Sequence, residues 1–283
     1  TYIGETMKVR TLDTIYIGGG TPTTLEPEQL ERLLGHIEAC FPVEQVKEYT
    51  VEAGRPDSIT REKLMAIKRH PVTRISVNPQ TMEDHVLRAI GRRHTAEELR
   101  ESMALVNSFG FAHVNMDLIA GLPEDTPEGF RRSLDACIAF GTDNITVHTL
   151  SLKKGSRILL EGLKVPSPED VAAMLDYAAP TLRAAGFAPY YLYRQKYMSG
   201  SFENIGWSRS GAECLYNIYI MSELCSILSF GAGGSTKMVE PGTNHIQRAF
   251  NLKYPKEYTE RPEKCLDNQA AFAAFYESLK GAL

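Results

Sequence analysis

The sequence predicts an α/β fold in which parallel strands curl into part of a barrel. Over residues 1–150, short apolar segments typical of strands alternate with segments that have the apolar spacing of helices. Polar or glycine residues mark the ends of the strand-like segments and recur about every 30 residues, the size of a βα unit. Such units predict right-handed crossovers and place the carboxyl end of every strand on one face, where active sites lie.

The predicted strands and helices alternate along the chain. The strands are expected at residues 15–17, 46–53, 74–78, 113–119 and 144–150. The first helix is expected to begin at Pro27, because proline favours the first helical position. The expected helix caps are Thr60, Thr81 with Asp84, Thr95 with Glu98, Thr126 and Ser167.

The pattern changes after residue 187. Aromatic residues gather in segment 187–197, and glycine-rich segments follow at 199–200 and 231–234. Extended segments and short helices are expected to replace the βα alternation there. The sequence therefore predicts two domains, a partial barrel over residues 1–186 and a smaller α+β subdomain over residues 187–283 that contacts substrate or closes the site.

Composition excludes several classes of protein. The chain has 283 residues, a formal net charge of −4, 43% hydrophobic and 23% charged residues, proportions typical of a folded globular protein. A small negative net charge excludes a protein that grips nucleic acid through clustered Lys and Arg. No apolar stretch reaches the roughly 18 residues of a membrane helix, and the first residues lack the pattern of a secretory signal. Five scattered cysteines favour a cytoplasmic location without disulfides.

A glycine-rich segment follows the first predicted strand and precedes the first helix. It reads Gly18-Gly19-Gly20-Thr21-Pro22-Thr23. Glycines let a ligand approach the backbone closely and allow a positive φ, but a tight βα turn would also explain two adjacent glycines. The segment lacks the Gly-Lys-Ser/Thr end of a phosphate-binding loop and the glycine spacing of a dinucleotide site. It is therefore a candidate ligand-binding loop of another kind.

Two carboxylates stand near predicted strand ends. A carboxylate inside a barrel mouth is unfavourable unless it meets a cation or hydrogen-bond donors, so Glu52 is expected either to bind a ligand or to form a salt bridge with Arg55. Asp117 has apolar neighbours on both sides, which favours a functional role. The histidines, His148 among them, are not at metal-ligand spacing and are expected to be core or surface residues. The cysteines include no C-x-x-C pair, and this chain's residues predict no metal site.

Four segments, taken in order, resemble a known family. They are residues 15–23, the segment around Glu52, Gln80 ahead of a helix that ends at Arg92, and residues 117–123. The ordered set is similar to the radical S-adenosylmethionine enzymes related to oxygen-independent coproporphyrinogen III oxidase. Later segments resemble the Firmicute-type coproporphyrinogen dehydrogenase branch more than the related haem chaperones. They are residues 190–196, 203–206, 214–218 and 230–235.

The resemblance implies a fold, two cofactors and a reaction. The fold is a partial TIM-like (β/α)6 barrel of the radical S-adenosylmethionine type that lacks its first strand. The cofactors are S-adenosylmethionine and a [4Fe–4S] cluster, and the partners are a tetrapyrrole substrate and a low-potential electron donor, with no nucleic acid and no membrane. The reaction is the anaerobic oxidative decarboxylation of coproporphyrinogen III to protoporphyrinogen IX in haem biosynthesis.

The resemblance also carries roles onto residues of this sequence. The glycine segment offers its backbone to the amino group of S-adenosylmethionine, and Arg92 suits its carboxylate. The positions implied in cofactor binding are Gly18, Gly19, Gly20, Thr21, Glu52, Gln80, Arg92, Asp117 and Ser151, with Gly231, Ala232 and Gly233 as a segment that closes over the site. The candidates for contact with substrate propionates are Arg194, Gln195 and Lys196, for which an exposed strand surface is the alternative.

The sequence departs from the family at the cluster ligands. The family's C-x-x-x-C-x-x-C loop lies upstream of the glycine segment, but only 17 residues precede Gly18 here and none is Cys. The chain as given is therefore expected to bind no cluster and to be inactive in decarboxylation. Two alternatives stay open. One is a haem chaperone that shares the barrel without decarboxylating, and the other is an unrelated TIM-barrel lyase or aldolase, which the lack of a lysine at a strand end disfavours.

Overall fold

The computed structural model describes residues 2–7, 12–152, 156–196 and 198–280. Its described residues form two compact units. The first comprises residues 14–35 and 47–215, and the second comprises the described parts of 1–13, 36–46 and 216–283. Each unit is described separately.

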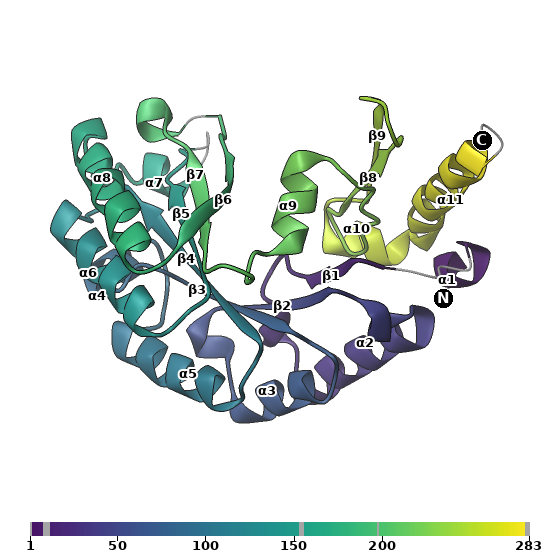
Figure 1. The fold of residues 1–283 in the computed structure, drawn as a ribbon, viewed down its shortest axis with the longest axis horizontal. Coiled ribbons are helices and arrows are strands. Elements are labelled where there is room, and N and C mark those ends of the chain that lie inside the picture. Colours follow the sequence, from purple (N-terminus) through teal and green to yellow (C-terminus); the bar gives the residue numbers. More distant parts are fainter. Residues whose placement is uncertain (1, 8–11, 153–155, 197, 281–283) are drawn as a thin grey trace. The chain divides into compact units, whose positions relative to one another are not determined.

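The first unit is built on a mixed seven-stranded sheet that curls into a half-barrel (Figure 1). Its strands are β1 (Thr14–Ile17), β2 (Glu48–Gly54), β3 (Arg74–Gln80), β4 (His113–Ala120), β5 (Asn144–Thr149), β6 (Ala188–Tyr193) and β7 (Asn204–Ser208). The first five pair in chain order and are all parallel. The predicted α/β fold and the five predicted strands are therefore confirmed.

The strands that follow residue 187 extend the same sheet. β7 pairs antiparallel with β5, and β6 pairs antiparallel with β7, so the order at this edge is β5-β7-β6. Because these backbone hydrogen bonds join residues 188–208 to the barrel, the first unit continues to Leu215 and the division into units does not fall at residue 187.

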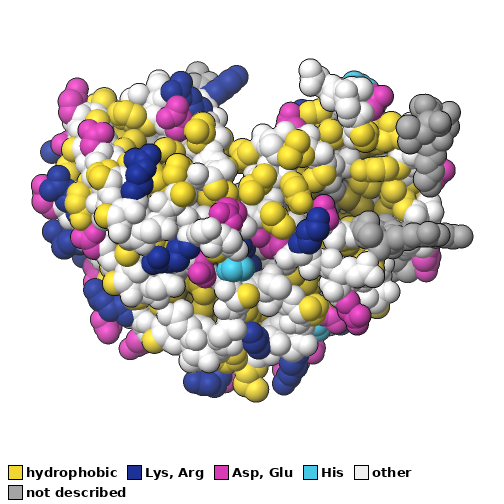
Figure 2. All heavy atoms as spheres, in the orientation of Figure 1, with side chains coloured by type: hydrophobic (Ala, Val, Ile, Leu, Met, Phe, Trp, Pro, Cys, Tyr) yellow, Lys and Arg dark blue, Asp and Glu magenta, His cyan; other side chains and the backbone are white. Residues whose placement is uncertain are grey.

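Helices cover the convex face of this sheet (Figure 1). The helices and single 3-10 turns of the first unit are η1 (Pro22–Thr24), α2 (Pro27–Cys40), η3 (Pro56–Ser58), α3 (Arg61–Lys68), α4 (Asp84–Ala89), α5 (Ala96–Ser108), α6 (Pro127–Ala139), α7 (Arg157–Leu160), α8 (Pro168–Ala184) and η4 (Ser199–Ser201). The C-terminal part of α2 belongs to the second unit. Basic and acidic side chains are interspersed over the outer helices on the face drawn in Figure 2.

Local capping fixes where four of these helices begin. Thr60, Thr126 and Ser167 each accept a hydrogen bond from the backbone N–H three residues later, and Thr95 with Glu98 forms a complete capping box, as predicted. The predicted Thr81–Asp84 capping box is wrong. Glu83 is the N-cap of α4, and no side chain caps this helix.

The two expected capping residues of α4 have other partners. Thr81 lies 3.2 Å from the hydroxyl of Ser133 on α6, which draws its side chain into the interior. Asp84 instead accepts a hydrogen bond from the backbone N–H of Ala96 over 2.8 Å and so ties α4 to the start of α5.

A buried polar network lies at the amino ends of the central strands. Arg74 on β3 is 1% exposed, and its Nε donates to Oε2 of Glu48 on β2 over 3.2 Å. Its Nη1 donates to the side-chain oxygens of Asn115 on β4 and Asn144 on β5. Its Nη2 donates to the carbonyl of Ala212 over 2.8 Å. These bonds tie segment 212–215 across the end of the half-barrel opposite the strand carboxyl ends.

The second unit contains a hairpin and several helices. Its elements are α1 (Tyr2–Met7), η2 (Val43–Gln45), α9 (Leu215–Ser222), β8 (Ser235–Val239), β9 (Ile246–Phe250), α10 (Pro255–Glu260) and α11 (Pro262–Lys280), with Leu215 shared with the first unit. β8 and β9 pair antiparallel. Ile3, Met238 and Phe272 belong to one buried apolar cluster that joins α1, β8 and α11. Among the described residues, no helix is long and apolar enough to cross a membrane.

Candidate functional site

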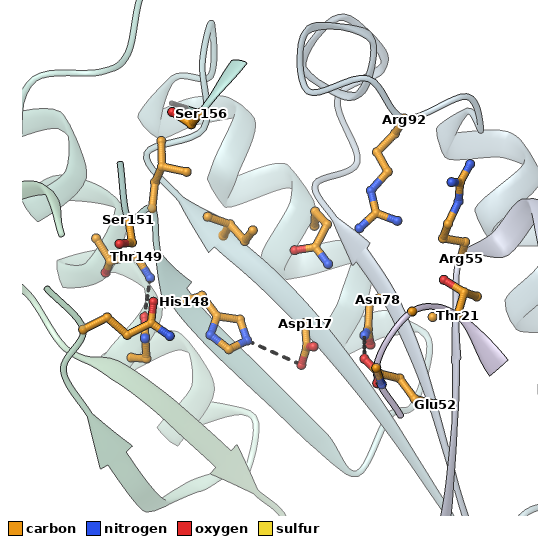
Figure 3. A pocket seen from close by; sticks show the side chains of 18 of the residues that line it. Thr21, Glu52, Arg55, Asn78, Arg92, Asp117, His148, Thr149, Ser151 and Ser156 are labelled. Atoms are coloured by element: carbon orange, nitrogen blue, oxygen red, sulfur yellow. Dashed lines mark hydrogen bonds and ion pairs between the residues drawn. The ribbon is translucent and has the colours of Figure 1, made fainter. Parts of the chain in front are cut away.

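A cavity of about 560 Å³ opens inside the first unit at the carboxyl ends of the parallel strands (Figure 3). The loop after β1 supplies one wall through Gly19, Gly20 and Thr21. The ends of β2 to β5 supply the floor, and residues of β6 and β7 supply the opposite wall. This is the face on which parallel βα units collect their functional side chains.

Glu52 is held at the floor of the cavity by two hydrogen bonds. Its Oε1 accepts from Nδ2 of Asn78 over 2.8 Å, and its Oε2 accepts from the backbone N–H of Gly19 over 3.3 Å. A Cβ at Gly18 would lie 2.6 Å from Oε2 of Glu52, so a larger residue there would displace this carboxylate. Burial and then the charge of Asp117 raise the pKa of Glu52, while the two hydrogen bonds lower it. A cation bound here would relieve the repulsion between the two carboxylates.

Asp117, His148 and Tyr193 form a row across the cavity on β4, β5 and β6. Nε2 of His148 lies 3.8 Å from Oδ1 of Asp117, and Nδ1 of His148 lies 3.3 Å from the hydroxyl of Tyr193. Because a carboxylate only accepts, the row is favourable when Nε2 carries the proton and Tyr193 donates to Nδ1. Burial, followed by the charge of Asp117, raises the pKa of Tyr193. Figure 3 shows His148 directed at Asp117.

Arg92 and Arg55 lie on the side of the cavity away from His148 (Figure 3). Burial, followed by the nearby charge of Arg55, lowers the pKa of Arg92. Arg55 forms a two-pronged ion pair with Asp57, in which Nε–Oδ1 is 3.0 Å and Nη2–Oδ2 is 2.6 Å. The cavity is therefore acidic at its floor and basic at one wall.

Two backbone conformations in the left-handed region shape the cavity. Gln80, the last residue of β3, has φ of 70°, which is unfavourable for a residue with a side chain. Gly54, at the end of β2, has φ of 64°, and a Cβ there would lie 3.2 Å from Cγ2 of Thr21. The turn at Gly54 lets Thr21 and Arg55 both reach the cavity lining.

The cavity brings together most of the predicted cofactor residues. Those that line it are Gly19, Gly20, Thr21, Glu52, Gln80, Arg92, Asp117 and Ser151, together with Gln195 from the substrate set. Gly18 is adjacent, directly against Glu52. The hydroxyl of Ser151 donates to the carbonyl of Lys196 over 2.8 Å and ties the end of β5 to the segment after β6.

The other predicted residues lie elsewhere. The exposed Arg194 side chain pairs with Glu203 over 2.8 Å and is not part of the lining. Gly231, Ala232 and Gly233 belong to the second unit, so their role in closing the site stays a prediction. The alternative prediction, a salt bridge between Glu52 and Arg55, is wrong, because the guanidinium of Arg55 pairs with Asp57.

Sequence reasoning missed several lining residues. His148 was expected in the core or on the surface, but it lines the cavity beside Asp117. The position of His148 next to the end of a predicted strand was the available signal. Tyr193 and Asn204 reach the lining only because β6 and β7 join the sheet, and Asn204 accepts a hydrogen bond from the backbone N–H of Thr149 over 2.7 Å.

The donor set fits S-adenosylmethionine but not an iron–sulfur cluster. Carboxylates for an ammonium and hydroxyls, a guanidinium for a carboxylate and open backbone at glycines all face one cavity. In contrast, the described residues contain no group of three or more His, Cys, Asp or Glu placed to hold a metal ion. Cys137 and Cys214 are fully buried. The part of the chain that the structure describes does not fit an iron–sulfur cluster.

The fold and the cavity define an α/β half-barrel with a ligand site at the carboxyl ends of its strands. Residues 3–137 match the family model described as the Radical SAM superfamily, and the chain has homologues of the coproporphyrinogen oxidase type.

Two relatives in sequence and one solved structure are similar to this chain. The chain is 42% identical over 275 residues to the oxygen-independent coproporphyrinogen-III oxidase-like protein HemZ of Bacillus subtilis, covering 95% of this chain and 55% of that protein. It is 30% identical over 257 residues to the heme chaperone HemW of Mycobacterium tuberculosis, covering 88% of this chain and 60% of that protein. The fold is similar to coproporphyrinogen III oxidase HemN of Escherichia coli, with TM-score 0.70, 20% identity, and coverage of 93% and 61%.

The chain thus spans a little over half the length of these relatives. Their names point to two kinds of protein, an oxidase and a chaperone.

Proposed function

We propose that the cavity of the first unit binds S-adenosylmethionine and that the protein acts in haem biosynthesis. The reaction proposed is the anaerobic oxidative decarboxylation of coproporphyrinogen III to protoporphyrinogen IX. The observation that carries the proposal is the placement of Glu52, Asp117 and Arg92 around one cavity next to an open glycine segment. The 42% identity to a coproporphyrinogen-III oxidase-like protein supports the choice of reaction.

Three charged groups of the cavity have a part in holding the cofactor. Glu52 accepts from the ammonium of the methionyl group, which offsets the repulsion from Asp117. Asp117 accepts from the ribose hydroxyls, with His148 holding its carboxylate from the other side. Arg92 binds the methionyl carboxylate. When bound, S-adenosylmethionine supplies the radical chemistry of the superfamily, and these residues hold its methionyl and ribose groups.

The substrate residues are a further part of this proposal. Gln195 lines the cavity, and Arg194 lies next to it on an exposed segment where it pairs with Glu203. We propose that Arg194, Gln195 and Lys196 contact propionate groups of the tetrapyrrole. Arg194→Ala should raise the KM for the tetrapyrrole more than it slows cleavage of S-adenosylmethionine.

The reaction is tested in the complete gene product under anaerobic conditions. The protein is supplied with coproporphyrinogen III, S-adenosylmethionine and a low-potential reductant, and the products are separated by chromatography. Protoporphyrinogen IX is the expected product. Its absence from preparations that still cleave S-adenosylmethionine would remove the decarboxylation from the proposal.

A haem chaperone is the second candidate function, and the 30% identity to proteins named HemW favours it. Such a protein is expected to bind haem and to form no vinyl product. Haem titration of the same preparations separates the two candidates. Stoichiometric haem binding without decarboxylation favours the chaperone.

A further inference from the structure

The basic wall of the cavity contains two guanidinium groups where one carboxylate ligand is expected. Arg55 and Arg92 both line the cavity, and Figure 3 shows them on the same wall. They are close enough for the charge of Arg55 to lower the pKa of Arg92. Two like charges that face one cavity repel each other, so an anion that lies between or beside them stabilises this wall.

Asp57 offsets only part of this charge. Its two oxygens accept from Nε and Nη2 of Arg55 at 3.0 and 2.6 Å, so both oxygens of the carboxylate are bonded to one guanidinium. Asp57 is also the only described carboxylate whose charge acts on Arg92. The side chain of Arg92 has no ion pair with any described residue. Two cations thus face one anion, and the wall keeps a positive charge.

The neighbouring residues provide no further anion. His94, beside Arg92, is 3% exposed, and its two ring nitrogens have no partner among the described residues. Burial, followed by the charge of Arg92, lowers the pKa of this imidazole, which favours its neutral form. Glu52 is engaged by Asn78 and Gly19.

The position of Arg55 is fixed by its backbone as well as by its ion pair. It follows Gly54, whose φ of 64° turns the chain at the end of β2. It precedes Pro56, the first residue of the turn η3. With Nε and Nη2 held by Asp57, the remaining Nη1 is the group free to donate to a ligand. A guanidinium held in this way loses little conformational entropy when it binds.

We propose that Arg55 is the second guanidinium of a carboxylate-binding subsite, in which Arg92 is the first and Asp57 is the positioning residue. The inference rests on the proposed function and deepens it, because it names the group that this wall binds. The carboxylate belongs either to the methionyl end of S-adenosylmethionine or to a propionate of the tetrapyrrole. Both ligands present the same planar anion to a guanidinium.

Calorimetric titration of the 283-residue chain with two ligands tests the first source. S-adenosylmethionine and decarboxylated S-adenosylmethionine differ only in the carboxylate. Arg55→Ala should weaken S-adenosylmethionine about tenfold, the loss of one charge-assisted hydrogen bond, and leave the decarboxylated ligand within about twofold. Arg55→Lys should restore part of the affinity, because lysine keeps the positive charge but lacks the planar set of N–H donors of a guanidinium.

Fluorescence titration with coproporphyrin III tests the second source. Arg69→Ala is the matched control in both titrations, because Arg69 is an exposed arginine that pairs with Glu31 over 3.2 Å and is not part of the cavity lining. A loss in Arg55→Ala that is confined to coproporphyrin III assigns the carboxylate to a propionate and supports the subsite.

Two results overturn the inference. One is unchanged affinity of Arg55→Ala for all three ligands, and the other is an equal loss for S-adenosylmethionine and its decarboxylated form. Failure of the unsubstituted chain to bind either form contradicts the proposed cofactor instead, and the coproporphyrin titration then decides the role of Arg55 by itself. Thermal unfolding of each variant checks that the fold is intact.

Discussion

Nδ2 of Asn78 donates to Oε1 of Glu52 over 2.8 Å, so the end of β3 holds the carboxylate that the end of β2 supplies. The hydroxyl of Ser76 in turn donates to Oδ1 of Asn78 over 2.7 Å, which fixes the amide orientation. Two polar side chains of β3 thus position the half-buried carboxylate of β2 before any ligand arrives.

This hydrogen bond should control the pH dependence of cation binding. The pKa of Glu52 is raised by burial and by Asp117, so affinity for S-adenosylmethionine should fall as the pH drops through that raised pKa. Asn78→Ala removes a bond that favours the ionised form, which should move the midpoint to higher pH. The measurement is calorimetric affinity from about pH 5 to 8. Asn107→Ala, which removes an exposed amide bonded to the carbonyl of Phe140, is the control. Identical midpoints in Asn78→Ala and the control would contradict the assignment.

The strained backbone at Gln80 should lower the stability of the fold, while its side chain should favour ligand binding. Its φ of 70° is unfavourable for a residue with a Cβ, so Gln80→Gly should stabilise the chain by about 0.5–1 kcal/mol. Because Gln80 lines the cavity, the same substitution should weaken S-adenosylmethionine. Glu124→Gly, at φ of 64° outside the cavity lining, should stabilise without changing affinity. Chemical denaturation and calorimetry provide the two measurements. The prediction is wrong if Gln80→Gly binds S-adenosylmethionine as tightly as the unsubstituted chain does.

The buried Arg74 network should be essential to the fold. Arg74→Met removes the guanidinium that pairs with the buried carboxylate of Glu48, and should lower the free energy of unfolding by about 3–5 kcal/mol. Adding Glu48→Gln should recover part of this loss. Arg100→Ala, which removes an exposed pair with Glu97, should change it by less than about 0.5 kcal/mol. Denaturant titration gives the three values, and equal losses for Arg74→Met and Arg100→Ala would refute the role of the network.

Asp125 should make stability fall between about pH 4 and 6. Burial raises its pKa from 3.8 to about 6, and Oδ2 has no hydrogen-bond partner among the described residues. The pKa of Asp125 in the folded chain lies above its value in the unfolded chain. The contribution of the protonated carboxyl to stability is therefore fully present below about pH 4 and is lost as the pH rises through about 6. Asp125→Asn keeps an oxygen for the N–H of Thr126 and should stabilise the chain by about 1–2 kcal/mol at pH 7.5. That gain should vanish near pH 4, and a gain of the same size at both pH values would argue against the raised pKa.

Local signals predict much of the first unit. Apolar runs give the five parallel strands, and Thr60, Thr95 with Glu98, and Thr126 give helix starts, because caps and strand runs depend on a few adjacent residues. The capping signal at Thr81 fails because Ser133, which is distant in sequence, competes for its hydroxyl.

The candidate site could be predicted only in part, for a similar reason. The ends of parallel strands meet by topology, so Glu52 and Asp117 could be placed in one mouth from the strand pattern. Tyr193 reaches His148 only because β7 inserts between β5 and β6, a pairing that joins residues far apart in sequence. The Arg55–Asp57 pair depends on the left-handed turn at Gly54, which no residue spacing predicts.

The central claim is that the acidic floor of the cavity binds S-adenosylmethionine, and one titration tests it most directly. The 283-residue chain and its Asp117→Ala variant are each titrated with S-adenosylmethionine by calorimetry. Asp135→Ala, which removes an exposed carboxylate bonded to Tyr177, serves as the control. The account predicts that Asp117→Ala loses about tenfold or more in affinity while Asp135→Ala matches the unsubstituted chain. Equal binding by all three proteins would contradict it.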